Sequence, residues 1–220
     1  MDSQPTIQRD TLSNQAYRVL RGAILARRYP LGTRLVVREL AETLGLSPTP
    51  IKEALAALAR EGLVQATPHK GYQVPNPSPE DMREVYELRE ALEGLAARLA
   101  AIRGEKNLGK RLEAILQSQE EAAMRGDLEA YGDLDLAFHR TLWEASQNKR
   151  LHQAAENLHG IVRLLISTTA ALPGRLPQSL SEHHVVLERV VSKDPNAAES
   201  AMRQHVRQAW KALGEFLGLT

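Results

Sequence analysis

The sequence has 220 residues, of which 28 are Lys or Arg and 27 are Asp or Glu, and it contains no cysteine. The lack of cysteine excludes disulfide bonds and thiolate chemistry. No apolar run approaches the roughly 18 residues of a membrane helix, so a membrane span is not expected. Residues 1–10 are polar and lack the apolar segment of a secretory signal, so we expect a loose arm there and a cytoplasmic protein.

The positive charge is concentrated in the first third of the chain. Residues 1–78 contain ten Lys and Arg against six Asp and Glu, whereas residues 79–220 contain eighteen against twenty-one. The N-terminal part is therefore the part suited to contact with a phosphate backbone, although the bias is modest.

Residues 37–58 have the pattern of two helices joined by a tight turn. Apolar residues recur at helical spacing on both sides of Gly45, and a glycine tolerates the left-handed conformation that ends a helix. Ser47 is a candidate N-cap for the second helix. Pro48 would occupy the first helical position, where its missing N–H costs nothing. The sequence therefore predicts a helix-turn-helix.

Two further features favour DNA binding. Thr49 and Lys52 are expected to be exposed near the start of the second helix, where a helix-turn-helix presents side chains to the edges of bases in the major groove. Two short strands should follow around a turn that contains His69 and Lys70, which would make the unit a winged helix. The alternative is an ordinary small helical domain whose basic residues are merely solvated. The expected strands are residues 63–67 and 72–74.

A second unit is expected after a proline-rich linker at residues 75–79, since three prolines in five residues cannot continue a helix or a strand. Ser78 should cap a new helix, with Pro79 at its first position. Helix formers dominate from there, so the sequence predicts an antiparallel helical bundle over residues 80–220. Its first helix carries a clean apolar stripe. The expected helices are residues 79–103, 106–125, 128–146, 149–171, 178–192 and 195–217, and the stripe is Val85, Leu88, Leu92, Leu95 and Leu99.

Histidines on otherwise apolar helix faces suggest a metal site. Asp135 and His139 are four residues apart and share one face, and His183 and His205 lie on apolar faces of two further helices. A lone buried carboxylate is costly unless it is paired or bound to a metal. One Asp with three neutral imidazoles suits Zn²⁺ or Ni²⁺. For any single His a hydrogen-bonded role is the simpler interpretation, and helical spacing does not separate His183 from His184.

The N-terminal pattern resembles the GntR family of bacterial transcription regulators over about residues 11–75. The matching segments are PLGTRL (30–35), RELA (38–41), LSPTPIKEAL (46–55), EGLV (61–64) and GYQV (71–74). The family usually has Arg at Pro48 and at Lys52, so one base contact is lost and a point charge replaces a bidentate fork. The resemblance implies a homodimer that binds a palindromic operator through Arg38, Ser47, Thr49, Lys52, His69, Lys70 and Gly71.

The C-terminal part resembles the FCD domain, the all-helical effector domain of the FadR-type GntR regulators. The matching segments are YELREALE (86–93), DLAFHRTL (135–142), ASQN (145–148), EHH (182–184) and RQH (203–205). Gly is usual at Gln147, which is a minor departure. Metal-binding members use one Asp and three His, and the resemblance maps these ligands onto Asp135, His139, His183 and His205.

The resemblance also implies a small organic acid as effector, bound at the metal or beside it. Arg89 is the best candidate to bind its carboxylate, and Arg163, on a very apolar helix, is a weaker one. Each has an alternative role. Arg89 could form a salt bridge with Glu93 or Glu90, and Arg163 could pair with a carboxylate elsewhere in the bundle.

The patterns and the resemblance together predict a mainly α protein with a winged helix-turn-helix at residues 11–75 and a bundle at residues 80–220. The expected function is a ligand-responsive transcription regulator, most simply a repressor, and not an enzyme. One alternative is a metal-sensing regulator in which the ion itself is the signal. The other is a DNA-anchored metal-dependent hydrolase, for which no second carboxylate is clearly placed as a general base.

Overall fold

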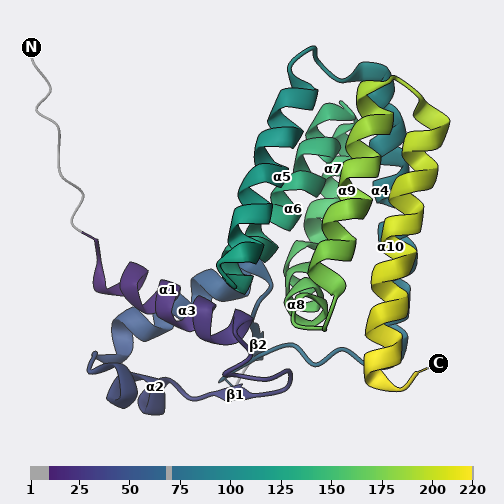
Figure 1. Cartoon of the computed structure of the whole chain (residues 1–220). Coiled ribbons are helices and arrows are strands. Elements are labelled where there is room, and N and C mark those ends of the chain that lie inside the picture. The colour runs from purple at the N-terminus through teal and green to yellow at the C-terminus, as the bar shows by residue number, and fades with distance from the viewer. Residues whose placement is uncertain (1–9, 68–70, 220) are drawn as a thin grey trace, which may run out of the picture. The chain divides into compact units, whose positions relative to one another are not determined.

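The protein has two compact units, residues 1–76 and 77–220, in a computed structural model that describes residues 10–67 and 71–219. The fold is mainly α with one small antiparallel sheet, which confirms the predicted class (Figure 1). The predicted linker, residues 75–79, spans the division between the units. The first unit contains α1 (Leu12–Leu25), β1 (Arg34–Leu35), α2 (Val37–Leu44), α3 (Pro48–Glu61), β2 (Gln65–Thr67) and β3 (Gly71–Gln73).

Helices α2 and α3 form the predicted helix-turn-helix. Gly45 adopts a φ of +65° and ends α2, and Pro48 begins α3 after Ser47. Ser47 occupies the N-cap position, yet its side chain makes no capping hydrogen bond with any described residue. Ile51 and Leu55 are completely buried and mark the inner face of α3, a helix that packs against both α1 and α2. The opposite face of α3 is therefore free to be exposed.

The sheet has the strand order β1–β3–β2, and β2 and β3 form the predicted hairpin. Within that hairpin Gln65 pairs with Gln73 and Thr67 with Gly71. Its first strand is shorter than predicted, since β2 begins only at Gln65, after the buried residues Leu63 and Val64. The two-residue strand β1, which pairs with β3, was not predicted.

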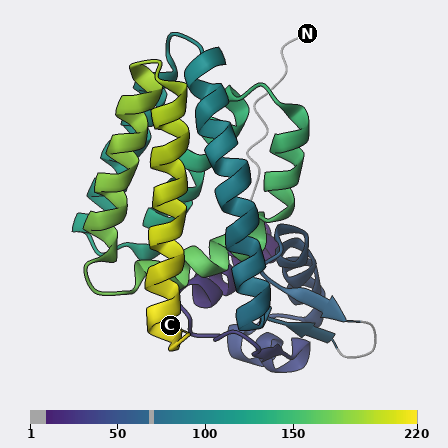
Figure 2. The ribbon, with the colours of Figure 1, turned by 90° about the vertical axis from the view of Figure 1, so that its right-hand side faces the viewer.

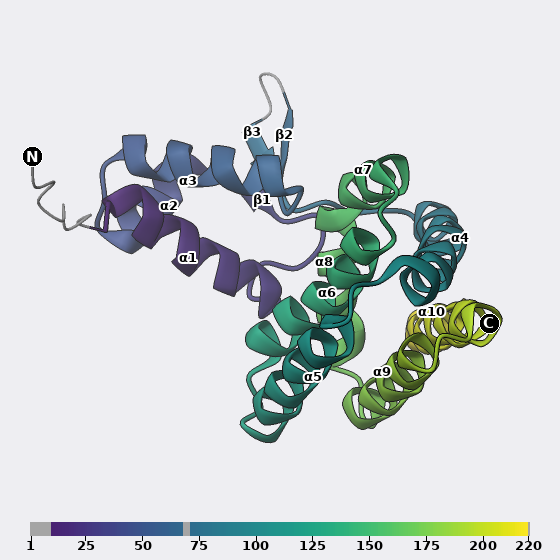
Figure 3. The same cartoon turned by 90° about the horizontal axis from the view of Figure 1, so that it is seen from above.

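The second unit is a helical bundle whose long helices run side by side and are seen nearly end-on in Figure 3. Ser78 caps the first of them, as predicted, and it also forms a capping box with Asp81. None of the described helices is both long and apolar enough to cross a membrane. The helices are α4 (Pro79–Arg103), α5 (Leu108–Met124), α6 (Leu128–Ala145), α7 (Lys149–Asn157), α8 (His159–Ala170), α9 (Arg175–Val191) and α10 (Pro195–Leu217).

The single helix predicted over residues 149–171 is wrong, because the chain turns at Leu158 and forms α7 and α8. The N–H of Leu158 donates to the carbonyl of Ala155, three residues back, at 3.0 Å, so the last turn of α7 is tightened. Helix α8 then crosses the long helices at a steep angle (Figures 1 and 2). Every residue from Val162 to Ala170 is buried, so this turn directs α8 into the core.

Helix α4 has two unlike faces. Its inward face contains small buried residues, including Ala97 and Ala100, and lies beside α10 (Figure 2). Gly94 is part of this close approach, since a Cβ there would lie 2.7 Å from Cγ of Arg203. The apolar stripe identified in the sequence is not this face. Leu88 and Leu95 of the stripe are exposed.

Candidate functional sites

The start of α3 presents the first candidate surface. Ser47, Thr49 and Lys52 are all exposed, while Pro50 and Ile51 between them are buried and hold the helix on its own unit. Exposed hydroxyl and ammonium groups at the start of a rigidly held helix can donate to base edges and phosphates. The predicted exposure of Thr49 and Lys52 is therefore confirmed.

The other predicted DNA contacts surround this surface in the sequence. Arg38 on α2 is exposed, with its Nε 3.7 Å from a carboxylate oxygen of Glu42. An exposed pair of this kind contributes little energy and leaves the guanidinium available. Gly71 is exposed with a φ of +86° and begins the second wing strand. His69 and Lys70 lie outside the described residues.

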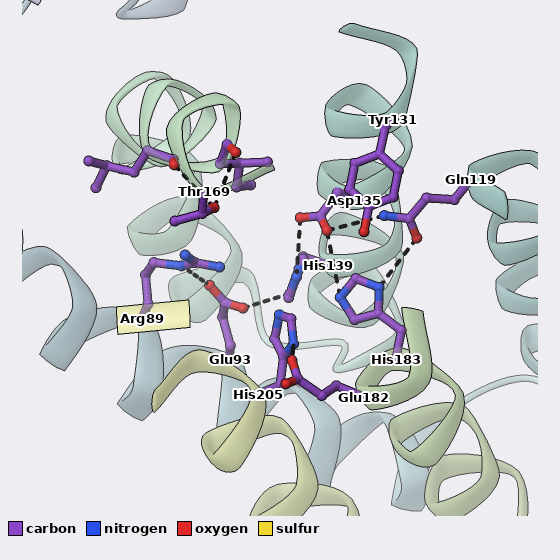
Figure 4. Close-up of polar contacts among 12 residues, drawn as sticks. Arg89, Glu93, Gln119, Tyr131, Asp135, His139, Thr169, Glu182, His183 and His205 are labelled. Atoms are coloured by element: carbon purple, nitrogen blue, oxygen red, sulfur yellow. Dashed lines mark hydrogen bonds and ion pairs between the residues drawn. The ribbon is translucent and has the colours of Figure 1, made fainter. Parts of the chain in front are cut away.

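The second candidate site is a cluster of three histidines inside the bundle. His139 on α6, His183 on α9 and His205 on α10 each offer one ring nitrogen, and these atoms all lie within 4.8 Å of one another. Asp135 lies one turn before His139 and points into the cluster (Figure 4). Its two carboxylate oxygens lie 3.7 Å from Nε2 of His139 and 3.8 Å from Nε2 of His183. All four side chains are buried.

Each imidazole has an oxygen atom at its other ring nitrogen. Nδ1 of His139 lies 2.6 Å from Glu93 of α4. Nδ1 of His205 lies 2.7 Å from Glu182 of α9. Nδ1 of His183 lies 3.3 Å from the amide oxygen of Gln119 of α5, whose amide nitrogen donates to Asp135 at 3.1 Å (Figure 4). Such oxygens fix the ring orientation and tautomer of metal-binding histidines.

The electrostatics of the cluster suit a divalent cation. Burial lowers the pKa of His183 to about 3 and that of His205 well below its usual range, so both rings are neutral at pH 7. Burial alone would raise the pKa of Glu93, but Arg89 and His139 outweigh it and hold that pKa at about 2. The cluster therefore combines neutral imidazole nitrogens with carboxylate oxygens.

A metal also fits the hydrogen bonding of the cluster. Nε2 of His139 and Nε2 of His183 are buried and have no hydrogen-bond partner among the described residues. Unpartnered buried polar atoms are costly, and a shared ion would satisfy both nitrogens at once. Imidazole and carboxylate ligands without sulfur suit borderline divalent ions.

A small cavity adjoins the cluster. Asp135 and His205 form part of its wall, and Arg89 and Arg175 also line it. The cavity has a volume of only about 20 Å³, which is enough for about one water molecule. The remaining wall includes Tyr86, Tyr131, Ser179 and the apolar residues Ile166, Ala170, Leu176 and Ala209.

Both units match known protein families. Residues 12–74 match the family described as "Bacterial regulatory proteins, gntR family", and residues 84–208 match the FCD domain. The chain belongs to the GntR family. The FCD match covers more than half of this GntR regulator, which is consistent with the all-helical second unit.

Relatives of this GntR regulator are themselves transcription regulators. It is 31% identical to the "Probable D-xylose utilization operon transcriptional repressor" of Paenarthrobacter nicotinovorans, over 91% of this chain and 88% of that protein. It is 30% identical to the "HTH-type transcriptional repressor RspR" of Escherichia coli, over 90% of this chain and 86% of that protein. The solved structure of E. coli McbR/YncC, 23% identical, has the same fold, with a TM-score of 0.74 over 94% of this chain and 99% of that one.

The structure brings together the four residues predicted as metal ligands in this GntR regulator. It also distinguishes the adjacent histidines, because His183 lies in the cluster while His184 is exposed and paired with Glu120 at 2.8 Å. Arg89 lines the cavity, and its Nε also donates to Glu93 at 2.7 Å, so both roles predicted for it are compatible with its position.

Arg163 has a different position from the one expected of an effector-binding residue. It is fully buried, its Nε donates to Asp133 at 2.8 Å, and its Nη2 donates to the backbone carbonyl of Glu129 at 2.8 Å. Gly132 leaves room for this guanidinium, since a Cβ there would lie 2.5 Å from Nη1. Arg163 is not among the residues that line the cavity. Its contact with Asp133 agrees with the alternative prediction, in which Arg163 pairs with a carboxylate elsewhere in the bundle.

Sequence reasoning missed the residues that support the cluster. Glu182 precedes His183 in a quoted motif, and Glu93 was considered only as a partner for Arg89. Gln119 gave no signal, because an amide on an amphipathic helix looks like any surface residue. Arg175 was missed because the predicted helix began at residue 178, whereas α9 begins at Arg175 itself. Both its Nη1 and its Nη2 donate to Glu182 at 3.0 Å.

Proposed function

We propose that this GntR regulator is a repressor that binds a palindromic operator as a homodimer and responds to a small organic acid held beside a divalent metal ion. The observation that carries the proposal is the meeting of three buried imidazoles beside a cavity lined by two arginines. The two similar proteins named above are also called repressors.

The metal ligands of the proposal are His139, His183, His205 and Asp135. Support comes from their convergence and from the unpartnered nitrogens described above. Zn²⁺ or Ni²⁺ suits this donor set. When bound, such an ion supplies a Lewis-acidic centre that attracts a carboxylate oxygen.

The acid would be held by Arg89 and Arg175 at the other side of the cavity. A planar guanidinium pairs well with a carboxylate through two parallel hydrogen bonds. Each arginine already has a buried or half-buried carboxylate partner, so an incoming acid must share or replace that partner. Because the cavity holds only about one water molecule, the acid must also widen it.

The DNA contacts of the proposal are Thr49 and Lys52 at base edges, with Arg38 and Ser47 beside them and His69, Lys70 and Gly71 at the wing. Two half-sites are needed because a single winged helix buries little surface on DNA. Ligand binding in the bundle changes DNA affinity only if it favours one arrangement of the protein over another.

The proposal is tested with the full chain purified without a chelator. Metal content is measured by mass spectrometry, and an operator is selected from a random DNA pool. DNA affinity is then measured by fluorescence anisotropy for metal-free protein, for Zn²⁺-loaded protein, and for loaded protein with sugar acids, hydroxy acids or dicarboxylates. We expect one acid class to raise the unfolding temperature of the loaded protein and to weaken DNA binding by at least roughly tenfold.

A second function, sensing of the metal itself, is favoured by the small volume of the cavity. In that case Zn²⁺ or Ni²⁺ alone would change DNA affinity and no acid would add to the effect. A protein that carries no metal as purified and takes up neither ion would show that the proposed site is wrong. A loaded protein that selects no operator would contradict the DNA-binding part of the proposal.

A further inference from the structure

Several residues with hydroxyl groups line the cavity beside the histidine cluster, and Tyr86 differs from the others. Its hydroxyl oxygen is buried and makes no hydrogen bond with any described residue. By contrast, Oγ1 of Thr169 donates within its own helix, to the carbonyl of Ile166 at 3.2 Å. The hydroxyl of Tyr131 donates to the carbonyl of Leu176 at 3.4 Å. The Tyr86 hydroxyl is therefore still available to a ligand in the cavity.

The packing of Tyr86 does not account for its hydroxyl. The ring lies against that of Trp210, with centroids 5.4 Å apart, and a phenylalanine ring could make the same contact. A buried hydroxyl without a partner lowers stability, because it has lost its hydrogen bonds to water and gained none in exchange. Such a group in a native fold calls for an explanation, and a ligand that supplies the missing acceptor is one.

The Tyr86 hydroxyl is a neutral donor close to two cations. Burial raises the pKa of Tyr86, although Arg89 and Arg175 lower it in part, so the phenol keeps its proton at pH 7. Cζ of Arg89 lies 5.0 Å from the centre of the Tyr86 ring, and both side chains line the same small cavity. An acid bound there would therefore meet guanidinium groups and a phenolic O–H together.

These donors exceed the needs of one carboxylate. A guanidinium presents five N–H donors in a fixed fork, and two of them are enough for both oxygens of a carboxylate. Arg89 and Arg175 can thus hold the carboxylate, which leaves the Tyr86 hydroxyl for a different oxygen of the ligand. Because the cavity has a volume of only about 20 Å³, that oxygen must lie close to the carboxylate.

We propose that Tyr86 determines the specificity of the effector site, by donating a hydrogen bond to an oxygen on the carbon next to the carboxylate. The effector is then a 2-hydroxy or 2-oxo acid, and the same acid without this oxygen binds more weakly. A site built to hydrogen-bond such an oxygen rejects the analogue that lacks it, because the buried hydroxyl stays unpartnered. The proposal rests on the proposed function and narrows the class of its acid.

The test compares two acids on the full chain loaded with Zn²⁺. Glycolate and acetate are the probes, because they are the smallest pair that differs by one hydroxyl next to the carboxylate. Tyr86→Phe should lower the affinity for glycolate roughly three- to tenfold, the value of one neutral hydrogen bond, and leave that for acetate within about twofold. Isothermal titration with millimolar acid measures both affinities.

Tyr131→Phe is the matched control. It removes a hydroxyl from the same cavity, but one that already donates to Leu176. The two acids should therefore lose or gain affinity by the same factor, so that the ratio of their affinities remains that of the wild type. Zn²⁺ content and unfolding temperature are measured on the same samples. Tyr86→Phe should not lower the unfolding temperature, because its hydroxyl has no partner in the described part of the chain.

The outcomes separate this proposal from the proposed function. An unchanged affinity ratio in Tyr86→Phe would overturn the role of Tyr86 and assign any preference for glycolate to chelation by the metal. If the unfolding temperature also fell, the hydroxyl would belong to the fold. In both cases the wild type still binds acid. Zn²⁺-loaded wild type that binds neither glycolate nor acetate would overturn the proposal at an earlier point, the carboxylate site itself.

Discussion

The start of α3 and the histidine cluster are opposite kinds of functional surface. The side chains predicted to contact DNA on α2 and α3 lie within 15 residues of one another and are exposed. The cluster and its supporting oxygens come from five helices, between Glu93 and His205, and all of these residues are buried except Glu182, which is half-buried. The first can act only if its polar groups are left free for a partner. The second can act only if its side chains are held in place by the surrounding groups while ring nitrogens stay open for an ion.

This difference predicts different consequences of mutation. Changes at the start of α3 should alter binding and leave the fold intact, because little packs against those side chains. Changes around the cluster should affect metal binding and stability together, because removing one buried group leaves another without its partner.

The largest expected effect is loss of a metal ligand. His139→Ala should abolish stoichiometric Zn²⁺ binding, a loss greater than the roughly 10- to 100-fold caused by changing an outer partner. Isothermal titration of chelator-treated protein measures the affinity. His184→Ala is the control, because that exposed histidine is paired with Glu120 outside the cluster. Unchanged Zn²⁺ affinity in His139→Ala would remove this residue from the site.

The next effect concerns the ion pair between Arg89 and Glu93, both about 3% exposed at the side chain. Arg89→Ala leaves the Glu93 carboxylate buried without its cationic partner, which should cost about 3–5 kcal/mol of unfolding free energy. Denaturant unfolding measures it. Arg83→Ala, which breaks exposed ion pairs on the same helix, should lower the unfolding free energy far less, because solvent screens exposed pairs. Equal losses of unfolding free energy in the two variants would contradict the expected cost of leaving Glu93 buried without its partner.

A smaller effect is expected from the outer partner of His205. Glu182→Gln keeps the shape of the side chain but removes the charge that makes the imidazole a better ligand, so Zn²⁺ affinity should fall about 10- to 100-fold. Glu156→Gln is the matched control, because Glu156 contacts His152 and His159, which are not in the cluster. Equal affinity of the two variants for Zn²⁺ would contradict the supporting role of Glu182.

The smallest effect should come from the exposed surface. Lys52→Ala should weaken binding by about 1–3 kcal/mol at one base position of the operator and leave the unfolding temperature unchanged. Anisotropy titrations with single-base operator variants measure it. Lys110→Ala, an exposed lysine on α5, should leave the affinity unchanged. A uniform loss across all operator variants would assign Lys52 to a phosphate contact and not to a base.

The helix-turn-helix was predictable because its signals are local. Gly45, Pro48 and the apolar spacing act within a few residues of one another, and the structure reproduces each of them. The turn at Leu158 was not predictable from the sequence. The apolar residues keep helical spacing on both sides of it, and the N–H of Leu158 merely donates to a carbonyl three residues back. Strand β1 is two residues long and depends on its pairing with β3, which lies far along the chain.

The candidate site was predictable only in part, for the same reason. Asp135 and His139 share a helix, so their proximity follows from spacing, whereas the places of His183 and His205 came from resemblance to a family. Gln119 and Arg175 contribute from other helices, and no periodicity relates them to the cluster. Periodicity also identified the apolar stripe of α4 from Val85 to Leu99 without indicating which way it faces.

The Glu182 carboxylate is shared between Arg175 and His205, and this has a thermodynamic consequence. An acid that takes Arg175 for itself leaves the full negative charge of Glu182 beside His205, which makes that ring a stronger electron donor. Acid and ion would then each tighten the binding of the other, and linkage requires the two enhancements to be the same factor. Cellular metal supply would therefore set the concentration of acid at which the regulator responds.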